Sequence, residues 1–144
     1  MFFDLDKWVG HITELSMKEI TEAFGRRLKK FGITRIQWIA LYYIKNNPEI
    51  TQRQLSKIMF VKDSSVGRLL DRLERDGLIE RIRNIDDRRT INLVLTKVGK
   101  TKIDKLVVEG DYFNDRLIEG LTDEELMVFE KVMSTMANNV RFYE

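Results

Sequence analysis

Residues 51–95 decide the fold of this chain, and they read TQRQLSKIMFVKDSSVGRLLDRLERDGLIERIRNIDDRRTINLVL. Thr51 is followed three residues later by Gln54, a capping-box pattern in which two side chains satisfy backbone groups at a helix start. A short helix is therefore predicted there, and a second helix after residues 60–62, with Asp63 as its cap. Apolar residues of this second helix recur at i, i+3, i+4 and i+7, namely Val66, Leu69, Leu70 and Leu73. Two helices joined by a tight turn predict a helix-turn-helix.

The stretch after these two helices changes from helical to strand periodicity. Gly77 is placed to follow the second helix as its C′ residue. Residues 78–83 alternate apolar and polar side chains, and residues 90–95 again place apolar side chains on one face. The pattern predicts a β-hairpin whose charged tip is formed by residues 84–89. The order helix, helix, hairpin is that of a winged helix-turn-helix, in which the second helix enters a DNA major groove.

Further helices are predicted on both sides of this region. Upstream, apolar residues at helical spacing predict a helix from Asp6 to about Lys30, which Gly32 ends. Three more helices begin at a hydroxyl residue able to cap them, at Thr34, Thr96 and Thr122. The first of these runs to about Asn46 and should bury Trp38, Leu41 and Tyr42. The fold class is therefore mostly α, with about six helices plus a β-hairpin wing.

Composition excludes several classes of protein and site. The chain has 144 residues, of which 43% are hydrophobic and 33% charged, as expected for one compact domain with a sizeable core. It has no cysteine and one histidine, so thiol chemistry is excluded and neither a metal site nor a cofactor is expected. No leader pattern or membrane-spanning apolar run is found, so we expect a cytoplasmic protein without a membrane partner.

Basic residues are concentrated in the middle of the chain. Residues 51–100 carry 12 basic and 7 acidic side chains, whereas residues 101–144 carry 5 and 10. A basic lobe beside an acidic one can attract phosphates while the whole chain stays nearly neutral. Chance clustering on solvated faces is the alternative.

One face of the second helix of the motif could contact DNA. Opposite its apolar stripe lie Ser64, Ser65, Gly67, Arg68, Arg72 and Arg75. The early residues of such a helix reach base edges, so Ser64, Ser65 and Arg68 are candidates for base or phosphate contacts. Gly67 costs roughly 1 kcal/mol relative to alanine in a helix interior, and either lets the backbone approach DNA or reflects close packing. Arg72 either contacts phosphate or pairs with a nearby carboxylate of Asp71, Asp76 or Glu80.

The hairpin tip offers a second candidate contact. Asp87 and Arg89 are two residues apart, so in a strand-like segment their side chains can share a face and form a bidentate pair. Such a pair would orient the guanidinium toward a narrow minor groove. The alternative is an ordinary solvated turn, in which exposed ion pairs contribute ~0–1 kcal/mol.

The chain resembles MarR-family transcription regulators. The residues that carry the resemblance are SSVGRLLDRLERDGLIER at 64–81, Asp87-Arg88-Arg89 and LTKVG at 95–99, and it extends over about the whole chain. It implies that Ser65 and Arg68 contact DNA, and that Arg89 enters the minor groove with Asp87 supporting it. The position of Gly67 is commonly a hydroxyl residue in this family, which puts one expected hydrogen bond to DNA in doubt.

The resemblance also implies an organisation and an assembly. Residues 1–144 would form a single MarR-like domain, with a winged helix-turn-helix lobe at 34–96 and a helical dimerisation lobe from 1–33 and 97–144. A homodimer would then bind a near-palindromic operator in double-stranded DNA. The apolar stripes after Ile103 and after Phe129 support a dimer, because they exceed what one small winged helix needs to cover.

Aromatic residues on the first two helices could form an effector site, as in other members of this family. The candidate residues are Trp8, His11, Phe24, Trp38 and Tyr42. A small aromatic or phenolic ligand would fit such a site between the two lobes, and core packing is the alternative role for these side chains.

The sequence therefore predicts a sequence-specific DNA-binding transcription regulator that acts as a homodimeric repressor and is released by a small ligand. The alternative is a winged-helix module that binds an acidic protein. An enzyme is not expected, because the chain has no nucleophile–base pair, no glycine-rich phosphate loop and no metal-ligand spacing.

Overall fold

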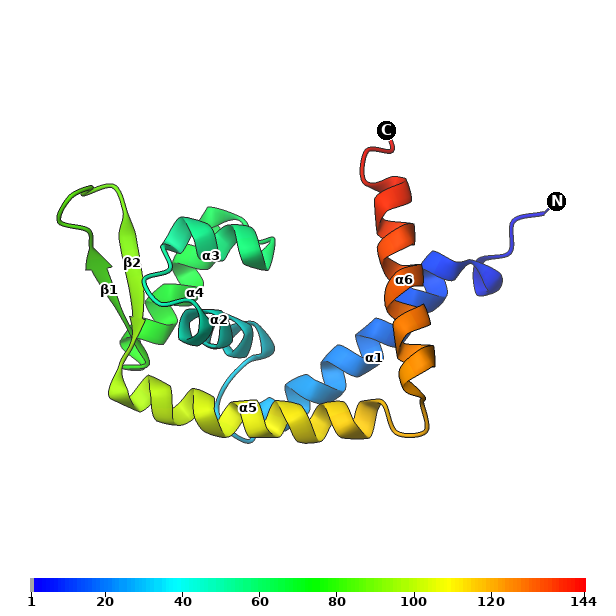
Figure 1. Cartoon of the computed structure of the whole chain (residues 1–144), viewed down its shortest axis with the longest axis horizontal. Helices are drawn as coiled ribbons and strands as arrows, with labels where there is room; N and C mark the ends of the chain where they lie inside the picture. Colours follow the sequence, from blue (N-terminus) through cyan, green and yellow to red (C-terminus); the bar gives the residue numbers. More distant parts are fainter. Residues whose placement is uncertain (1) are drawn as a thin grey trace. The chain divides into compact units, whose positions relative to one another are not determined.

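The computed structural model describes residues 2–144 and is mostly helical (Figure 1). Its elements are η1 (Leu5–Lys7), α1 (Val9–Lys29), α2 (Arg35–Asn46), α3 (Gln52–Met59), α4 (Asp63–Arg75), β1 (Ile79–Arg83), β2 (Ile91–Leu95), α5 (Lys97–Leu117) and α6 (Asp123–Val140). The prediction of six helices and a hairpin wing is confirmed. The chain forms two compact units, one reaching Asp111 and the other spanning Tyr112–Glu144. The predicted division into a winged-helix lobe and a dimerisation lobe concerns an assembly and stays a prediction.

The predicted helix starts are confirmed by their hydrogen bonds. Thr34, Thr51 and Thr122 each accept the N3 backbone N–H, and the N3 side chain accepts the N–H of the cap. Thr96 caps α5, because its hydroxyl oxygen accepts the Gly99 N–H at 3.0 Å. These contacts lie within three residues along the chain, so each helix start is encoded locally.

Glycines end three of the segments, and among them are the predicted ends at Gly32 and Gly77. Gly32, Gly77 and Gly120 have φ values of +70°, +73° and +85°, a region in which glycine meets no Cβ penalty. At the end of α4, the Leu78 N–H donates to the Leu73 carbonyl at 2.9 Å and the Gly77 N–H donates to the Glu74 carbonyl at 3.0 Å. This pair of bonds is a Schellman motif, which turns the chain from α4 into the wing.

Three local predictions are wrong. The N-cap of α4 is Lys62, and the Asp63 carboxylate instead accepts the Ser56 hydroxyl at 2.5 Å across the turn. The first predicted helix is divided, because a 3-10 turn ends at Lys7 and α1 begins only at Val9. Tyr42 is not buried, since it lies on the outer side of α2 and 41% of it is exposed.

The core of the first unit lies between α2, α3, α4, α5 and the hairpin. Its fully buried side chains include Leu41, Leu55, Leu70, Leu73, Leu93 and Leu106. The two strands pair antiparallel from Ile79–Leu95 to Arg83–Ile91. Beyond this pairing, the Leu93 N–H donates to the Ile50 carbonyl at 2.9 Å, so the wing is also attached to the start of α3.

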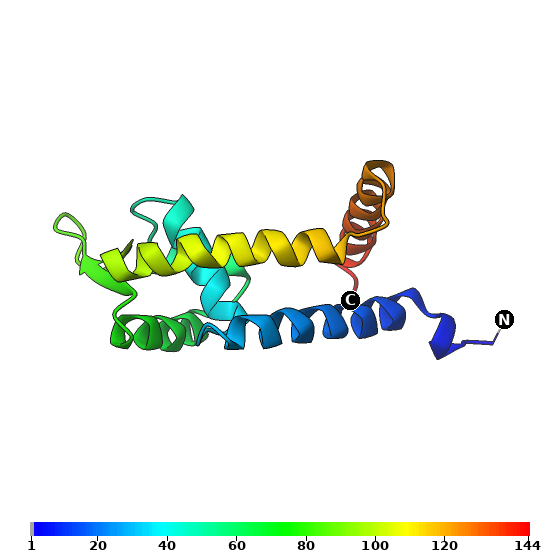
Figure 2. The same cartoon turned by 90° about the horizontal axis from the view of Figure 1, so that it is seen from below.

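The C-terminal end of α1 lies beside α5 (Figure 2). Arg27 Nη2 is 2.6 Å from Glu109 Oε2, and Lys102 Nζ donates to the Phe31 carbonyl at 2.6 Å. In the second unit, α6 contains no buried residue. None of the helices described here combines the length and the apolar character needed to cross a membrane.

Candidate nucleic-acid interface

The burial of α4 determines which of its side chains are available to a partner. Val66, Leu69, Leu70 and Leu73 are buried on one side. The predicted contact residues Ser64, Ser65, Arg68 and Arg72 are therefore exposed on the other side. Within residues 2–144, no carboxylate forms an ion pair with Arg68 or Arg72, so the alternative pairing of Arg72 with Asp71, Asp76 or Glu80 is wrong. Both cations are available to phosphates or bases.

Gly67 is not required by packing inside the chain. A Cβ atom at this position would have Gln52 Nε2 as its nearest neighbour, at 3.8 Å, which is an ordinary van der Waals distance. The close-packing explanation is therefore wrong. Beside it, Gln52 Oε1 is buried and has no hydrogen-bond partner in the described part of the chain. A buried acceptor without a partner is costly, which makes this side of α4 a place where a partner molecule could contribute a donor.

The wing tip is a hydrogen-bonded turn. Asp87 Oδ1 accepts the Arg89 N–H at 3.0 Å, and Asp87 Oδ2 accepts the Thr90 hydroxyl at 3.1 Å. The Thr90 N–H donates to the Asp87 carbonyl at 3.0 Å and closes the turn. The predicted bidentate pair is wrong, because both carboxylate oxygens hold the turn and, in the described chain, no ion pair joins Asp87 to Arg89. Asp87 therefore fixes the backbone of Arg89 and leaves its guanidinium exposed.

Arg81 attaches the wing to α4, a role that sequence reasoning missed. Its Nη2 is 2.6 Å from Asp71 Oδ1 and 3.0 Å from Glu74 Oε1. The hydrogen bond from the Arg81 guanidinium, followed by that from its backbone N–H, lowers the pKa of Glu74 below its ordinary value. The same contact with Glu74 raises the pKa of Arg81. A signal was present, because Glu74 and Arg81 have opposite charges and flank the Gly77 turn, three residues before it and four residues after it.

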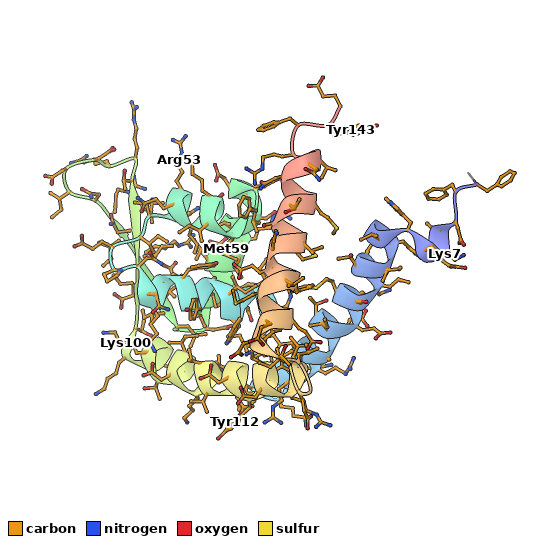
Figure 3. All side chains as sticks on the ribbon, turned by 45° about the vertical axis from the view of Figure 1, so that its right-hand side comes forward. Lys7, Arg53, Met59, Lys100, Tyr112 and Tyr143 are labelled. Atoms are coloured by element: carbon orange, nitrogen blue, oxygen red, sulfur yellow. The ribbon has the colours of Figure 1, made fainter. Side chains whose placement is uncertain are left out.

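A hollow of about 430 Å³ lies between the start of α3, the first residue of α4 and the wing. Its lining residues are Thr51, Gln52, Arg53, Asp63, Asp87, Arg89, Thr90 and Ile91. It brings the first turn of α3 beside the wing residues predicted from sequence. Figure 3 shows Arg53 projecting from α3 at the edge of the unit away from α5. Arg53 was missed, although an exposed cation in the first turn of a helix-turn-helix is visible in the sequence.

The candidate effector residues are only partly brought together. The rings of Phe24 and Trp38 meet edge to face at 4.9 Å, and those of Trp38 and Tyr42 stack at 6.1 Å. Trp38 Nε1 donates to the Leu106 carbonyl at 3.1 Å. Trp8 instead contacts Phe3, with ring centroids 6.0 Å apart.

The remaining candidate, His11, is half-buried on α1. Residues 2–144 contain no cluster of side chains that could hold a metal ion. The ring contact with Phe24 and the hydrogen bond to the Leu106 carbonyl give Trp38 a packing role.

Comparison with known proteins identifies the family. A model described as MarR family matches residues 31–90. The HTH-type transcriptional repressor MdtR of Bacillus subtilis is 31% identical over 110 residues, which cover 76% of this chain and 71% of that protein.

Two solved structures are close to the whole chain. The S. aureus MepR–DNA complex superimposes with a TM-score of 0.86 at 24% identity, covering 92% of this chain and 98% of that one. A mutant of E. coli MarR complexed with operator DNA gives 0.82 at 25% identity, covering 89% and 92%. The predictions of a winged helix and of a protein that is not an enzyme are thus confirmed. The chain belongs to the MarR family of transcription regulators.

Proposed function

We propose that this regulator binds a near-palindromic operator in double-stranded DNA as a homodimer. The observation that carries the proposal is the exposed cationic face of α4, which lies next to a wing with two exposed arginines, Arg88 and Arg89. Both relatives with similar structures, MepR and MarR, were solved as DNA complexes. Cations without internal partners favour a polyanionic ligand, because binding releases the counterions condensed on it.

The two elements would contact different grooves. With α4 in the major groove, Ser64, Ser65 and Arg68 would reach base edges, and Arg72 would contact a phosphate. Arg89 would enter the adjacent minor groove, with Arg88 at the flanking backbone. The open position of Gly67 would let the backbone of α4 approach the DNA.

The hollow between these elements would receive the DNA backbone. One sugar-phosphate strand separates any major groove from the neighbouring minor groove, so a protein that occupies both must accommodate that strand between them. In this chain the intervening space is lined by Thr51, Gln52 and Arg53. Hydroxyl, amide and guanidinium groups all donate to phosphate oxygens.

Exposed apolar residues support the homodimer. On α6, Phe129 is 57% and Val132 45% exposed, and Leu117 at the end of α5 is also exposed. The earlier part of the α5 stripe is not available, because Ile103 and Leu106 lie in the core. Apolar surface of this extent on a helix is expected to be covered by a second copy. Residues 1–33 and 97–144 would then form the dimerisation lobe.

We also propose that the protein represses transcription and is released from DNA by an effector. A repressor would occlude its operator, and a small aromatic or phenolic ligand near Trp38 and Tyr42 would release it by favouring another arrangement of the two winged helices. The stacked rings provide an apolar surface for such a ligand. A regulator of operator DNA would act in the cytoplasm.

Selection of binding sites from random duplex DNA tests the proposal. An enriched palindrome with half-site centres ~34–36 Å apart is expected. Fluorescence anisotropy should then show binding that weakens as salt rises. The variant Arg68→Ala should weaken binding by ~1–3 kcal/mol and relax the preference at one position of each half-site. Recovery of no preferred sequence, together with salt-independent binding, would favour a winged-helix module for an acidic protein.

A further inference from the structure

Ile85 lies at the wing tip and is almost fully exposed to solvent. At 95% exposure it is the most exposed of the large aliphatic side chains in residues 2–144. It belongs to the loop between β1 and β2, at the end of the hairpin away from α5 (Figure 1). Single exposed apolar residues are common on protein surfaces, but the backbone around Ile85 and the charges of its loop set it apart.

The backbone on both sides of Ile85 is fixed by hydrogen bonds. Before it, the Asn84 N–H donates to the Thr90 carbonyl at 2.9 Å and closes the loop. After it, the N–H groups of Asp86 and Asp87 donate to Asn84 Oδ1, at 2.9 and 3.2 Å. Isoleucine is β-branched, so rotation about χ1 is restricted as well. The loop therefore presents a stiff aliphatic side chain, and a contact made through it costs little ordering entropy.

The charged residues of the loop cancel one another. Asp86 and Asp87 offset Arg88 and Arg89, so residues 84–89 carry no net charge. Strong binding of DNA by this loop therefore needs a contribution besides net charge. Burial of one fully exposed isoleucine side chain is sufficient to raise an affinity by about tenfold.

The floor of a DNA minor groove offers a surface that an aliphatic side chain can discriminate. An A·T pair presents acceptors only, whereas a G·C pair adds the N2 amino group of guanine. An aliphatic side chain placed against that amino group would leave a buried donor without an acceptor, which is costly. Isoleucine is among the side chains that minor-groove binding proteins insert at base steps.

We propose that Ile85 is a specificity-determining residue, which lies against the floor of the minor groove and disfavours G·C pairs there. This inference rests on the proposed binding of operator DNA, because it requires the wing to occupy the minor groove. Ile85 and Arg89 belong to the same loop and contribute differently to the contact. Arg89 provides positive charge, whereas Ile85 provides apolar area and affects the base preference without affecting the salt dependence.

The test uses operators that differ only in the minor groove. Each base pair flanking the α4 half-sites is replaced in turn by G·C and by inosine·C, since inosine keeps the major-groove edge of guanine but lacks its N2 amino group. At one flanking pair or more, the parent is expected to bind the inosine operator about tenfold more tightly than the guanine operator. Fluorescence anisotropy measures both affinities across a salt series.

Substitution of Ile85 should abolish this discrimination. Ile85→Ser is expected to bind the two operators equally and to bind the inosine operator about tenfold more weakly than the parent does, with the parental salt slope. Ile85→Val retains a β-branched aliphatic side chain and should retain most of the discrimination. The matched control is Ile82→Ser, because Ile82 lies on β1 and is 48% exposed. It should discriminate like the parent, and circular dichroism checks that each variant is folded.

Three outcomes would overturn the inference while operator binding by the parent stands. Equal binding of the guanine and inosine operators by the parent would show that no side chain of the wing meets the amino group. Parental discrimination by Ile85→Ser would assign the preference to Arg89. Equal loss of discrimination in Ile82→Ser and Ile85→Ser would show that the shape of the hairpin, rather than the Ile85 side chain, matters. Failure of the parent to bind any operator would overturn the proposed function together with this inference.

Discussion

At the scale of single residues, a Cβ atom on Gly67 of α4 would meet only Gln52 Nε2, at 3.8 Å. Alanine stabilises a helix interior relative to glycine, so Gly67→Ala is expected to raise the free energy of unfolding by about 1 kcal/mol. The same methyl group would hold the backbone away from DNA and weaken operator binding by about tenfold. Chemical denaturation and fluorescence anisotropy measure the two effects.

Gly25→Ala provides the matched control for this prediction. Gly25 lies in α1, and nothing would lie within 4 Å of a Cβ atom there. The control should gain a similar amount of stability and bind the operator like the parent. If Gly67→Ala also bound like the parent, the backbone of α4 would not approach DNA at this residue.

Substitutions of Asp87 and of Arg89 should change operator binding in different ways. Arg89→Ala is expected to reduce the salt slope of operator binding by ~0.9 for each phosphate charge no longer neutralised. Asp87→Ala removes the acceptors for the Arg89 N–H and the Thr90 hydroxyl, so it should weaken binding without reducing that slope. Asparagine keeps an acceptor oxygen, so Asp87→Asn should retain most of the affinity.

The measurement is anisotropy across a salt series for the parent and the three variants. Loss of affinity in Asp87→Asn equal to that in Asp87→Ala would show that a single acceptor oxygen does not hold the turn. Parental binding by both Asp87→Ala and Arg89→Ala would show that the wing is only a solvated hairpin.

At the scale of elements, the contact of Arg81 with Glu74 and Asp71 holds the wing on α4. The pKa of Glu74 is lower in the folded chain than its ordinary value of 4.5. The contact therefore stabilises the fold above that ordinary value and loses this contribution as the pH falls through the folded pKa. The Glu74 side chain is 42% exposed, and solvent screening limits the contribution to about 0.2–1 kcal/mol.

Glu74→Gln should accordingly be less stable than the parent at neutral pH, and the difference should disappear in acid. Urea denaturation at several pH values measures it. Glu80→Gln is the control, because Glu80 is an exposed acid on β1 without an ion pair in the described chain. A difference between parent and Glu74→Gln that persisted at every pH would show that shape, rather than charge, holds the wing.

Element boundaries were predictable wherever a short segment determines them. The capping boxes at Thr34, Thr51 and Thr122 and the Gly77 turn depend on neighbours in the chain, and all were found from sequence. The Arg81 contact was missed because it depends on how the wing folds back on α4. Asp87 was misassigned because a spacing of two residues does not distinguish a strand from a turn.

The candidate site was predictable to a similar extent. Periodicity alone identified the exposed face of α4, because burying Val66 and Leu70 fixes which side chains remain outside. The hollow beside Gln52 could not be predicted, since it is formed by three segments distant in sequence. Arg53 could have been predicted from the sequence as well. It was missed because only the second helix of the motif was searched for contact residues.

At the scale of the whole molecule, the exposed apolar residues of α6 predict that the functional particle is a dimer. Light scattering should give twice the 17.1 kDa mass of one chain at micromolar concentration. Val132→Glu places a charge within the stripe and should yield monomers or aggregates, because burying an unpaired charge is costly. The exposed Lys131→Glu, one position earlier, is the control and should remain dimeric. A folded parent with the mass of one chain would contradict the prediction.

The junction between α5 and the end of α4 has a mechanical consequence. The Thr96 hydroxyl donates to the Gly77 carbonyl at 2.6 Å, and its N–H donates to the Leu78 carbonyl at 3.1 Å. A Cβ atom on Gly99 would lie only 1.9 Å from that same carbonyl oxygen. These contacts leave no room for the first turn of α5 to rotate about its axis unless the turn that ends α4 moves with it. We therefore expect a rotation of either helix to rotate the other.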